Sequence, residues 1–461
     1  MIRRILKVVG WSAVGTVGLV IVLYLIAVAI NWRDREPSAA AVRLTKFYSE
    51  RPVVSDQDNA YIYAMGFSVA PGQDSGQMGS KRAVWIRESN RAARWDTAND
   101  PLREEYDYRG KRLPVVQEFV DACKPQSANC AAAFVAGGAV FDQWIGSESW
   151  LLERYRELIA HHVWQDVMPF NVAAPLPPYA LVMDGQKLLL LNAKKFAESG
   201  DSVAVSRLLG EDLRFWRMVL ESSDALISRM IATAAINRHF QLGSLIFGQM
   251  RPVDVMSAVP DNWRVAVSEP ELSMQHCLVG EWMFMSAAMR NTNVDLVVRH
   301  DDSLVARAMR GLTAPLYQPQ DSVNRNAEYI WRMNEILSVP IERYEDSVNR
   351  TAEFSRQTRR EALPPRAAYN IIGQVLVGLA ASDFGTYARR VADLEGVRRA
   401  ALVAVTFRAA NTGMSEVAAE LADTPLRNPY NNRPFEWDGK NRDILFRGLE
   451  LGERREHRIH Y

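Results

Sequence analysis

The stretch DSVAVSRLLGEDLRFWRMVLESS, residues 201–223, is the middle one of three consecutive runs with the apolar spacing of an α-helix. The run before it, residues 177–199, begins at two prolines and ends at Gly200. The run after it, residues 224–247, opens with Asp224, just as the middle run opens with Asp201, and Asp is favoured at helix N-caps. Runs of about 20 residues joined by very short polar turns predict antiparallel helix hairpins.

The same pattern extends over residues 146–425, which we predict to be a helical domain. Further helices are predicted at 269–290, 301–311, 321–338, 341–361, 365–381, 384–410 and 413–422. Sustained alternation of apolar and polar residues is missing from this sequence range, which argues against a sheet there. The predicted fold class is therefore mainly α: an antiparallel helix-hairpin array, compact or solenoid-like, that follows one N-terminal transmembrane helix.

Two other regions have a different character. Residues 37–145 mix helical stretches with polar, turn-rich loops and form a separate predicted region. Near the end of the chain, Asp438 and Gly439 stand between two apolar runs, which is typical of a β-hairpin turn. We predict that residues 426–461 form a small C-terminal hairpin followed by a basic tail.

Residues 8–30, VVGWSAVGTVGLVIVLYLIAVAI, carry no charge. As a helix they would extend about 35 Å, enough to cross a hydrocarbon core of about 30 Å. Three basic residues precede this run and two follow it, which favours a cytoplasmic N-terminus. Residues 1–36 are thus predicted to be a cytoplasmic tip and a membrane anchor, with the lipid bilayer as the partner of residues 8–30.

A cleaved signal peptide is the alternative, with the AVA at residues 27–29 as its cleavage site. The apolar core of a signal peptide is shorter, about 7–15 residues, which favours the uncleaved anchor. Both interpretations place residues 33–461 outside the cytoplasm. Arg greatly outnumbers Lys, which is typical of GC-rich bacterial genomes. Together with the N-terminal apolar run, this leads us to expect a bacterial inner-membrane protein with most of its chain in the periplasm.

Charge and cysteine content restrict the possible partners and chemistry. The formal net charge is +1 and the basic residues are scattered, which excludes an obvious nucleic-acid-binding surface. Cys123 and Cys130 are a disulfide candidate in an oxidising compartment, with two unpaired thiols as the alternative. Their spacing fits no zinc-binding pattern, and no His lies nearby in the sequence.

The sequence contains none of the common hydrolase, metalloprotease, P-loop or dinucleotide-binding signatures, so we expect no cofactor and no metal. Glu157, His161, His162 and Asp166 have spacings that could hold a metal on a helix. The simpler interpretation is that His162 lines an apolar helix face and that His161 forms a solvated pair with Glu157. A cysteine nucleophile needs an oriented histidine close to it in space. His276, Cys277 and Glu281 are close in sequence, but adjacent residues on a helix point about 100° apart. We therefore incline to a protein that is not an enzyme.

One polar, aromatic stretch keeps an enzymatic alternative open. Its aromatic residues could stack on sugar rings, and its carboxylates could serve glycoside hydrolysis. The candidate groove residues are Trp95, Asp96, Asp100, Glu104, Glu105 and Tyr106. The alternative function is an envelope hydrolase that acts on cell-wall saccharide or peptide; a loop without catalysis is the simpler interpretation.

A near-repeat occurs in the C-terminal half, DSVNRNAEYIW at 321–331 and DSVNRTAEFSR at 346–356. Each copy has the composition of a helix start, and Pro340 between them should separate two helices. Shared helix-start chemistry, a local duplication and a binding motif used twice all remain open.

The segments LYQPQDSVNR (316–325) and RNPYNNRPFEWD (427–438) together resemble a family of bacterial envelope proteins without an assigned activity. The family element Pro-x-x-(Ser/Thr)-x-Asn corresponds here to Pro319, Ser322 and Asn324. The family tail usually has Asp and Gly where this chain has Asn428 and Asn432. The resemblance implies a mostly helical envelope protein with an N-terminal hydrophobic segment, and it singles out the first copy of the repeat. We expect a role in binding or scaffolding, with an envelope protein as a possible partner.

Overall fold

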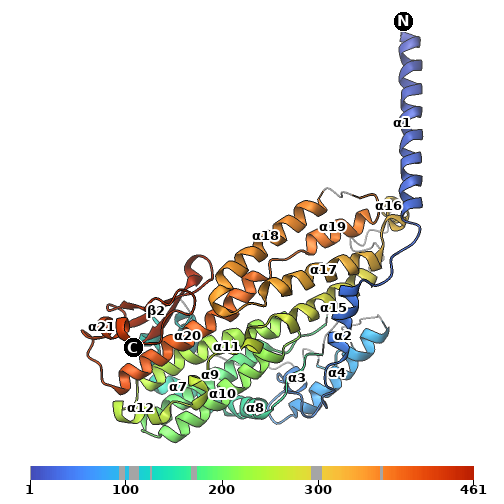
Figure 1. Ribbon diagram of the computed structural model, residues 1–461. Coiled ribbons are helices and arrows are strands. Elements are labelled where there is room, and N and C mark those ends of the chain that lie inside the picture. The colour runs from blue at the N-terminus through green and yellow to red at the C-terminus, as the bar shows by residue number, and fades with distance from the viewer. Residues whose placement is uncertain are drawn as a thin grey trace. The chain divides into compact units, whose positions relative to one another are not determined.

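The computed structural model in Figure 1 describes residues 2–92, 99–102, 114–124, 127–167, 174–291, 304–363 and 367–461. Over these residues the chain is mainly helical, and its strands are three short ones near the C-terminus. The predicted fold class, a helical array after an N-terminal apolar helix with a small terminal sheet, is confirmed.

The chain divides into two compact units, each assembled from separated segments. Unit 1 comprises Met1–Glu50, Trp282–Met333 and Thr351–Asp383, and unit 2 comprises Arg51–Glu281, Asn334–Arg350 and Phe384–Tyr461. This partition is interleaved along the chain, whereas the regions expected from the sequence were consecutive.

Unit 2 contains most of the helices and all three strands. Its helices are α3 (Ala60–Met65), α4 (Ser75–Ala92), α5 (Pro114–Ala122), α6 (Cys130–Ala136), α7 (Gly138–Ser147), α8 (Ser149–Ala160), α9 (Tyr179–Glu198), α10 (Ser202–Ser222), α11 (Leu226–Phe247), α12 (Pro252–Ala258), α13 (Asp261–Arg264), α14 (Glu269–Leu272), α20 (Gly385–Ala409) and α21 (Val417–Asp423), with the 3-10 turns η5 (Ile341–Arg343) and η6 (Gly452–Arg455). Helices α9, α10 and α11 pack against one another, α20 packs on α11, and the four supply many of its buried apolar side chains.

The hairpin of α9 and α10 follows from local sequence chemistry. Gly200 adopts a positive φ of 78°, which favours glycine, and ends the first helix. The Asp201 side chain then accepts a hydrogen bond from the Ala204 N–H at 2.9 Å and caps α10. The sequence therefore predicted this turn correctly, because both signals lie within a few residues of it.

The three strands form one antiparallel sheet in the order β1 (Glu436–Asp438), β2 (Asp443–Arg447) and β3 (Glu456–His460). The predicted hairpin is β1 and β2, joined by four residues, with Arg442 in the left-handed region. The predicted basic tail is instead largely strand β3, which pairs along the whole of β2. Its inward residues, His457 and Ile459, alternate with more exposed polar ones.

Phe446 of β2 fixes this sheet on helix α20. The ring is fully buried, and a Cβ at Gly396 of α20 would come within 2.1 Å of it. Glycine at position 396 therefore creates the space that the ring fills. Since a large buried aromatic side chain contributes about 1.5–3 kcal/mol by burial, this contact holds the terminal sheet against the helices.

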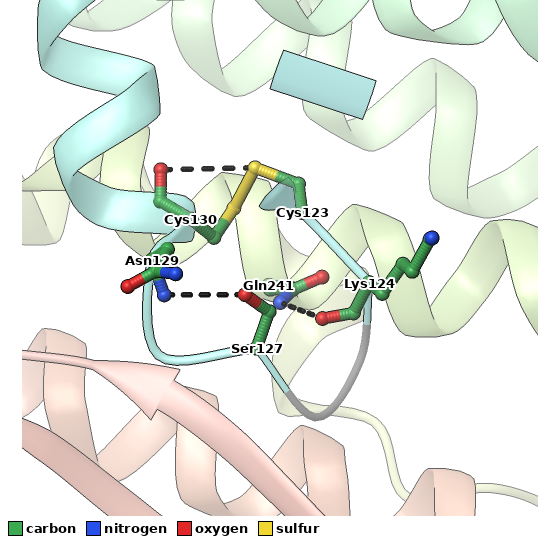
Figure 2. The surroundings of a disulfide bond; sticks show 6 residues. All are labelled: Cys123, Lys124, Ser127, Asn129, Cys130 and Gln241. Atoms are coloured by element: carbon green, nitrogen blue, oxygen red, sulfur yellow. Dashed lines mark hydrogen bonds between the residues drawn. A yellow bond between two sulfur atoms is a disulfide. The ribbon is translucent and has the colours of Figure 1, made fainter. Parts of the chain in front are cut away.

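Cys123 and Cys130 form a disulfide that closes a short loop between α5 and α6. Figure 2 shows that this loop also contacts α11, because the Gln241 side chain donates a hydrogen bond to the Lys124 carbonyl at 3.5 Å. Within the loop, the Asn129 N–H bonds the Ser127 hydroxyl oxygen at 3.2 Å. The third cysteine, Cys277, is free and buried.

We expect the double change Cys123→Ser and Cys130→Ser to lower the free energy of unfolding by about 2–3 kcal/mol, because the loop regains entropy in the unfolded state. Urea unfolding of the detergent-solubilised full chain measures this difference. Dithiothreitol should destabilise the wild-type chain by a similar amount and leave the double variant unchanged. Equal stability of the variant and the wild type would show that the loop is held by its other contacts.

Unit 1 contains α1 (Ile2–Ile30), α2 (Ala39–Ser49), α16 (Leu304–Thr313), the 3-10 turn η4 (Ala314–Leu316) and α19 (Ile371–Ala380). Helices α15 (Gln275–Asn291), α17 (Pro319–Leu337) and α18 (Tyr344–Ala362) have residues in both units. None of the apolar window Gly10–Ile30 of α1 is buried, and its length and hydropathy suffice to cross a membrane.

A second stretch, Ile371–Ala409, also has the length and apolarity of a membrane span, but 44% of its window is buried in protein. Its α20 part carries buried charged groups that the protein satisfies. Arg398 donates two hydrogen bonds to Glu395 at 2.8 and 2.7 Å, and Asp393 accepts one from the Leu449 N–H at 2.8 Å. We therefore interpret α20 as a core helix of unit 2.

Candidate functional site

The candidate groove residues of the sequence analysis fall mostly outside the described residues. This holds for Trp95, Asp96, Glu104, Glu105 and Tyr106. Asp100 is described, and its carboxylate accepts two hydrogen bonds from the Arg82 guanidinium, at 3.0 and 2.9 Å. Arg82 also donates to the Met65 carbonyl at 2.6 Å, so Asp100 serves a structural ion pair at the end of α3.

The histidine cluster is not arranged as a metal site. Helix α8 ends at Ala160, so His162 and Asp166 do not share its face as the spacing predicted. The Glu157 carboxylate accepts a hydrogen bond from the Tyr63 hydroxyl at 2.5 Å, and the His161 Nδ1 lies 3.0 Å from the Glu157 carbonyl oxygen. Among the residues that the structure describes, no group of three or more His, Cys, Asp or Glu side chains could hold a metal ion.

Cys277 is a poor candidate for a nucleophile. It is fully buried, and its thiol donates to the Met274 carbonyl at 3.2 Å. Burial raises the pKa of Cys277 to about 12, so the thiol stays protonated near neutral pH. The Nδ1 atom of the neighbouring His276 lies 3.5 Å from the Asp224 carboxylate.

The motif Pro319, Ser322 and Asn324 lies where the chain leaves α1. Pro319 opens α17, where a residue without an N–H is tolerated. The Asn324 side chain accepts from the Ser38 N–H and donates to the Glu36 carbonyl, both at 2.8 Å. The first turns of α17 therefore hold the segment that connects α1 to α2.

Two residues just after α1 complete this contact. The Asp34 carboxylate accepts hydrogen bonds from the Gln320 N–H at 2.7 Å and the Asp321 N–H at 3.0 Å. It thus satisfies two free N–H groups at the start of α17, where a negative charge is also favoured by the helix dipole. Asn31, which is 4% exposed, accepts at its carbonyl oxygen a hydrogen bond from the Gln318 side chain at 2.5 Å.

Asn370 lies at the centre of the network. It is fully buried, adopts a left-handed φ of 54° and caps α19. Its backbone N–H donates a hydrogen bond to the Asn31 side-chain oxygen at 2.6 Å. Its side-chain Nδ2 donates to the Asp321 carboxylate at 2.8 Å and to the Ser322 hydroxyl oxygen at 3.0 Å. We call the set Asn31, Asp34, Gln318, Ser322, Asn324 and Asn370 the anchor junction.

The second copy of the repeat has a different environment. Asp321 and Asp346 are each the third residue of their helix, α17 and α18, so neither is an N-cap residue. Asn349, the counterpart of Asn324, is exposed, whereas Asn324 is 6% exposed. The two copies thus share helix-start chemistry, and the contacts to the chain after α1 belong to the first copy.

We expect Asn324→Ala to accelerate hydrogen exchange at the Ser38 amide, because that N–H loses its acceptor. The loss of a buried hydrogen bond should lower the local opening free energy by about 1–3 kcal/mol. Hydrogen exchange with mass spectrometry on the full chain in detergent measures the change. Asn349→Ala is the matched control and should leave the exchange of residues 33–38 as in the wild type.

Sequence reasoning missed Asn31, Asp34, Gln318 and Asn370. Asp34 carried a usable signal, because a short acidic side chain outside a helix often caps the start of another one. Asn370 carried none, since its partners Ser322, Asp321 and Asn31 lie 48, 49 and 339 positions away in the sequence.

Unit 2 holds a separate pair of buried carboxyl groups. Asp166 accepts hydrogen bonds from the Asp224 N–H at 2.7 Å and the Ser228 hydroxyl at 2.5 Å, and Ser228 in turn lies 2.7 Å from the Tyr179 hydroxyl. The Asp224 carboxylate pairs with Arg51. Burial and the nearby Asp224 charge raise the pKa of Asp166 to about 7.

No protein-family model, curated protein or solved structure matches this chain.

Proposed function

We propose that this chain is a single-pass membrane protein of the bacterial inner membrane whose helical units lie in the periplasm and bind or scaffold an envelope protein. The observation that carries the proposal is the anchor junction. An exposed apolar helix of membrane-spanning length leads directly into a buried network of side-chain hydrogen bonds. Because the residues after the apolar helix are fixed to α17 and α19, this arrangement favours a defined attachment of α1 to the folded chain over a flexible linker.

Several features of α1 favour the proposed location. Trp11 and Trp32 lie near the two ends of the uncharged run 8–30 and are 76% and 78% exposed, and Trp is enriched at membrane interfaces. The excess of basic residues before the apolar run supports a cytoplasmic N-terminus. The disulfide between Cys123 and Cys130 supports an oxidising compartment for unit 2.

The described candidates for catalysis have structural roles, which favours binding over chemistry. Asp100 is paired with Arg82, Glu157 with the Tyr63 hydroxyl, and Cys277 is a buried thiol. Recognition of another protein by the surface of the units does not require these groups to be catalytically active.

Reporter fusions at Tyr461 test the topology. A reporter that is active only outside the cytoplasm should be active, and the protein should stay in the membrane pellet after alkaline carbonate extraction. Activity of a cytoplasm-restricted reporter alone would overturn the proposed orientation. A mature N-terminus at Ile30 would identify a cleaved signal peptide and remove the anchor.

Crosslinking in intact cells, followed by purification of the full chain in detergent, tests the role in binding. We expect reproducible adducts with one or a few envelope proteins. Hydrolysis of cell-wall saccharide or peptide by the purified full chain would contradict the proposal.

A further inference from the structure

Helix α16 and the turn η4 present apolar side chains that the described part of the chain leaves uncovered. Met309 is 49% exposed and Leu312 is 51% exposed, and they lie three residues apart on one helix. The residues that follow in the helix and in η4, GLTAPL at 311–316, carry no charge, and none of Ala314–Leu316 is buried. Exposed large apolar side chains on a strongly amphipathic helix are typical of elements that lie in a membrane interface.

A contact with α1 places this surface relative to the apolar run. The Tyr24 hydroxyl donates a hydrogen bond to the Leu312 carbonyl at 3.1 Å. Figure 1 shows α16 beside the C-terminal end of α1. Tyr24 precedes Ile30, the last residue of the apolar run, by six positions. At 1.5 Å per residue, Leu312 therefore lies level with a point about 9 Å before the end of the run.

This depth matches that of an interfacial helix. A run of 23 residues is about 35 Å long and the hydrocarbon core is about 30 Å thick, so the last few ångströms of the run lie among the headgroups. Interfacial helices bury their apolar face about 5–10 Å into the boundary between headgroups and acyl chains. The contact at Tyr24 brings α16 to this boundary.

We propose that α16 and η4 (residues 304–316) form a second membrane contact, with the lipid of the periplasmic leaflet covering Met309 and Leu312. The inference rests on the proposed function, because it requires α1 to span the bilayer. The anchor junction fixes the residues after α1 to α17 and α19, and α16 adds a lipid contact beside them. Unit 1 is then attached to the membrane at two places, which sets its orientation.

Depth-dependent quenching tests the proposal. Leu312→Cys, and separately Met309→Cys, are labelled with an environment-sensitive dye in the full chain. The native cysteines do not compete for the dye, because two form the disulfide and Cys277 is buried. The chain is reconstituted into vesicles of phosphatidylcholine with phosphatidylglycerol that contain lipids spin-labelled near the headgroup or near the chain end.

Two reference sites bracket the result. Val17→Cys in α1 is the membrane-embedded reference, and Val253→Cys in α12, where Val253 is 80% exposed, is the aqueous reference. We expect quenching at positions 309 and 312 to exceed that at 253 by at least about twofold, as expected for side chains in the interface. The headgroup label should quench them more than the chain-end label, and the reverse should hold at position 17.

The outcomes separate the two proposals. Quenching at 17 together with aqueous behaviour at 309 and 312 would overturn the second membrane contact and leave the anchor intact. Aqueous behaviour at all positions would overturn both proposals.

Discussion

Asp212→Ala will lower the free energy of unfolding by about 3–5 kcal/mol, because three buried donors lose an acceptor and each such loss costs about 1–3 kcal/mol. The Asp212 carboxylate is fully buried in unit 2. It accepts hydrogen bonds from the Tyr155 hydroxyl at 2.5 Å, the Gln186 side chain at 3.1 Å and the His239 Nδ1 at 2.7 Å. Alanine would remove this acceptor from all three donors, and the Gln186 amide would keep only its hydrogen bond to the Ala235 carbonyl at 3.0 Å.

Two tryptophan side chains hold the partners of Asp212 in place. The Trp263 indole N–H donates to the His239 Nε2 at 2.8 Å, which assigns the neutral tautomer with its proton on Nδ1. The Trp216 indole N–H donates to the Tyr155 hydroxyl at 2.8 Å. Both ring nitrogens of His239 are therefore occupied, and the His239–Asp212 pair has no free nitrogen with which to act as a general base.

Urea unfolding of the full chain in detergent measures the effect of Asp212→Ala. Asp254→Ala is the matched control, because Asp254 forms an ion pair with the exposed Arg251. Exposed pairs contribute about 0–1 kcal/mol, so the control should unfold nearly as the wild type does. A loss below about 1 kcal/mol for Asp212→Ala would contradict the network.

Asp166→Asn will remove a dependence of stability on pH. The pKa of Asp166 is raised from its model-peptide value of 3.8 to about 7, so the folded chain holds this proton more tightly than the unfolded chain. The stabilisation is fully present below pH 4 and is lost as the pH rises through 7. Since one pKa unit corresponds to about 1.4 kcal/mol, the loss amounts to at most about 4 kcal/mol.

Asparagine reproduces the protonated carboxyl group at this position. Its carbonyl oxygen can accept from the Asp224 and Ala225 N–H groups, and its amide can donate to the Ser228 hydroxyl. The neighbouring Asp224 carboxylate pairs with Arg51 and lies 3.5 Å from the His276 imidazole, and the substitution leaves all three side chains in place.

Thermal unfolding of the wild type and of Asp166→Asn between pH 4 and 8 measures the difference. We expect the two chains to be similarly stable at pH 4 and the variant to be the more stable one at pH 8. A variant that is less stable by the same amount at every pH would show that Asp166 is ionised throughout and acts only as a hydrogen-bond acceptor.

Local signals predicted most helices, and non-local contacts account for most of the errors. The turn at Gly200 and Asp201 was readable because its residues act on their own backbone. Strand β3 was not, because the sequence EHRIH is polar and becomes a strand only through its pairing with β2. The end of α8 at Ala160 was also missed, since the following residues kept a helix-like apolar spacing.

The candidate site was only partly predictable for the same reason. Ser322 and Asn324 were singled out through a family resemblance, but their partners Asn370, Glu36 and Ser38 carry no pattern of their own. A single sequence shows that an asparagine can form hydrogen bonds, but it does not identify the partners. Which partners it meets depends on chain segments hundreds of residues away.

The separation of 339 positions between Asn31 and Asn370 also sets a time scale for biogenesis. A ribosome adds about 5–20 residues per second, so roughly 20–70 s pass between the synthesis of these two residues. Throughout that interval α1 is already synthesised, and for most of it Asn31 and Asp34 lack the partners Gln318, Gln320, Asp321 and Asn370 that they have in the folded chain. The hydrogen bonds that fix the residues after α1 are consequently completed only when translation has passed Asn370.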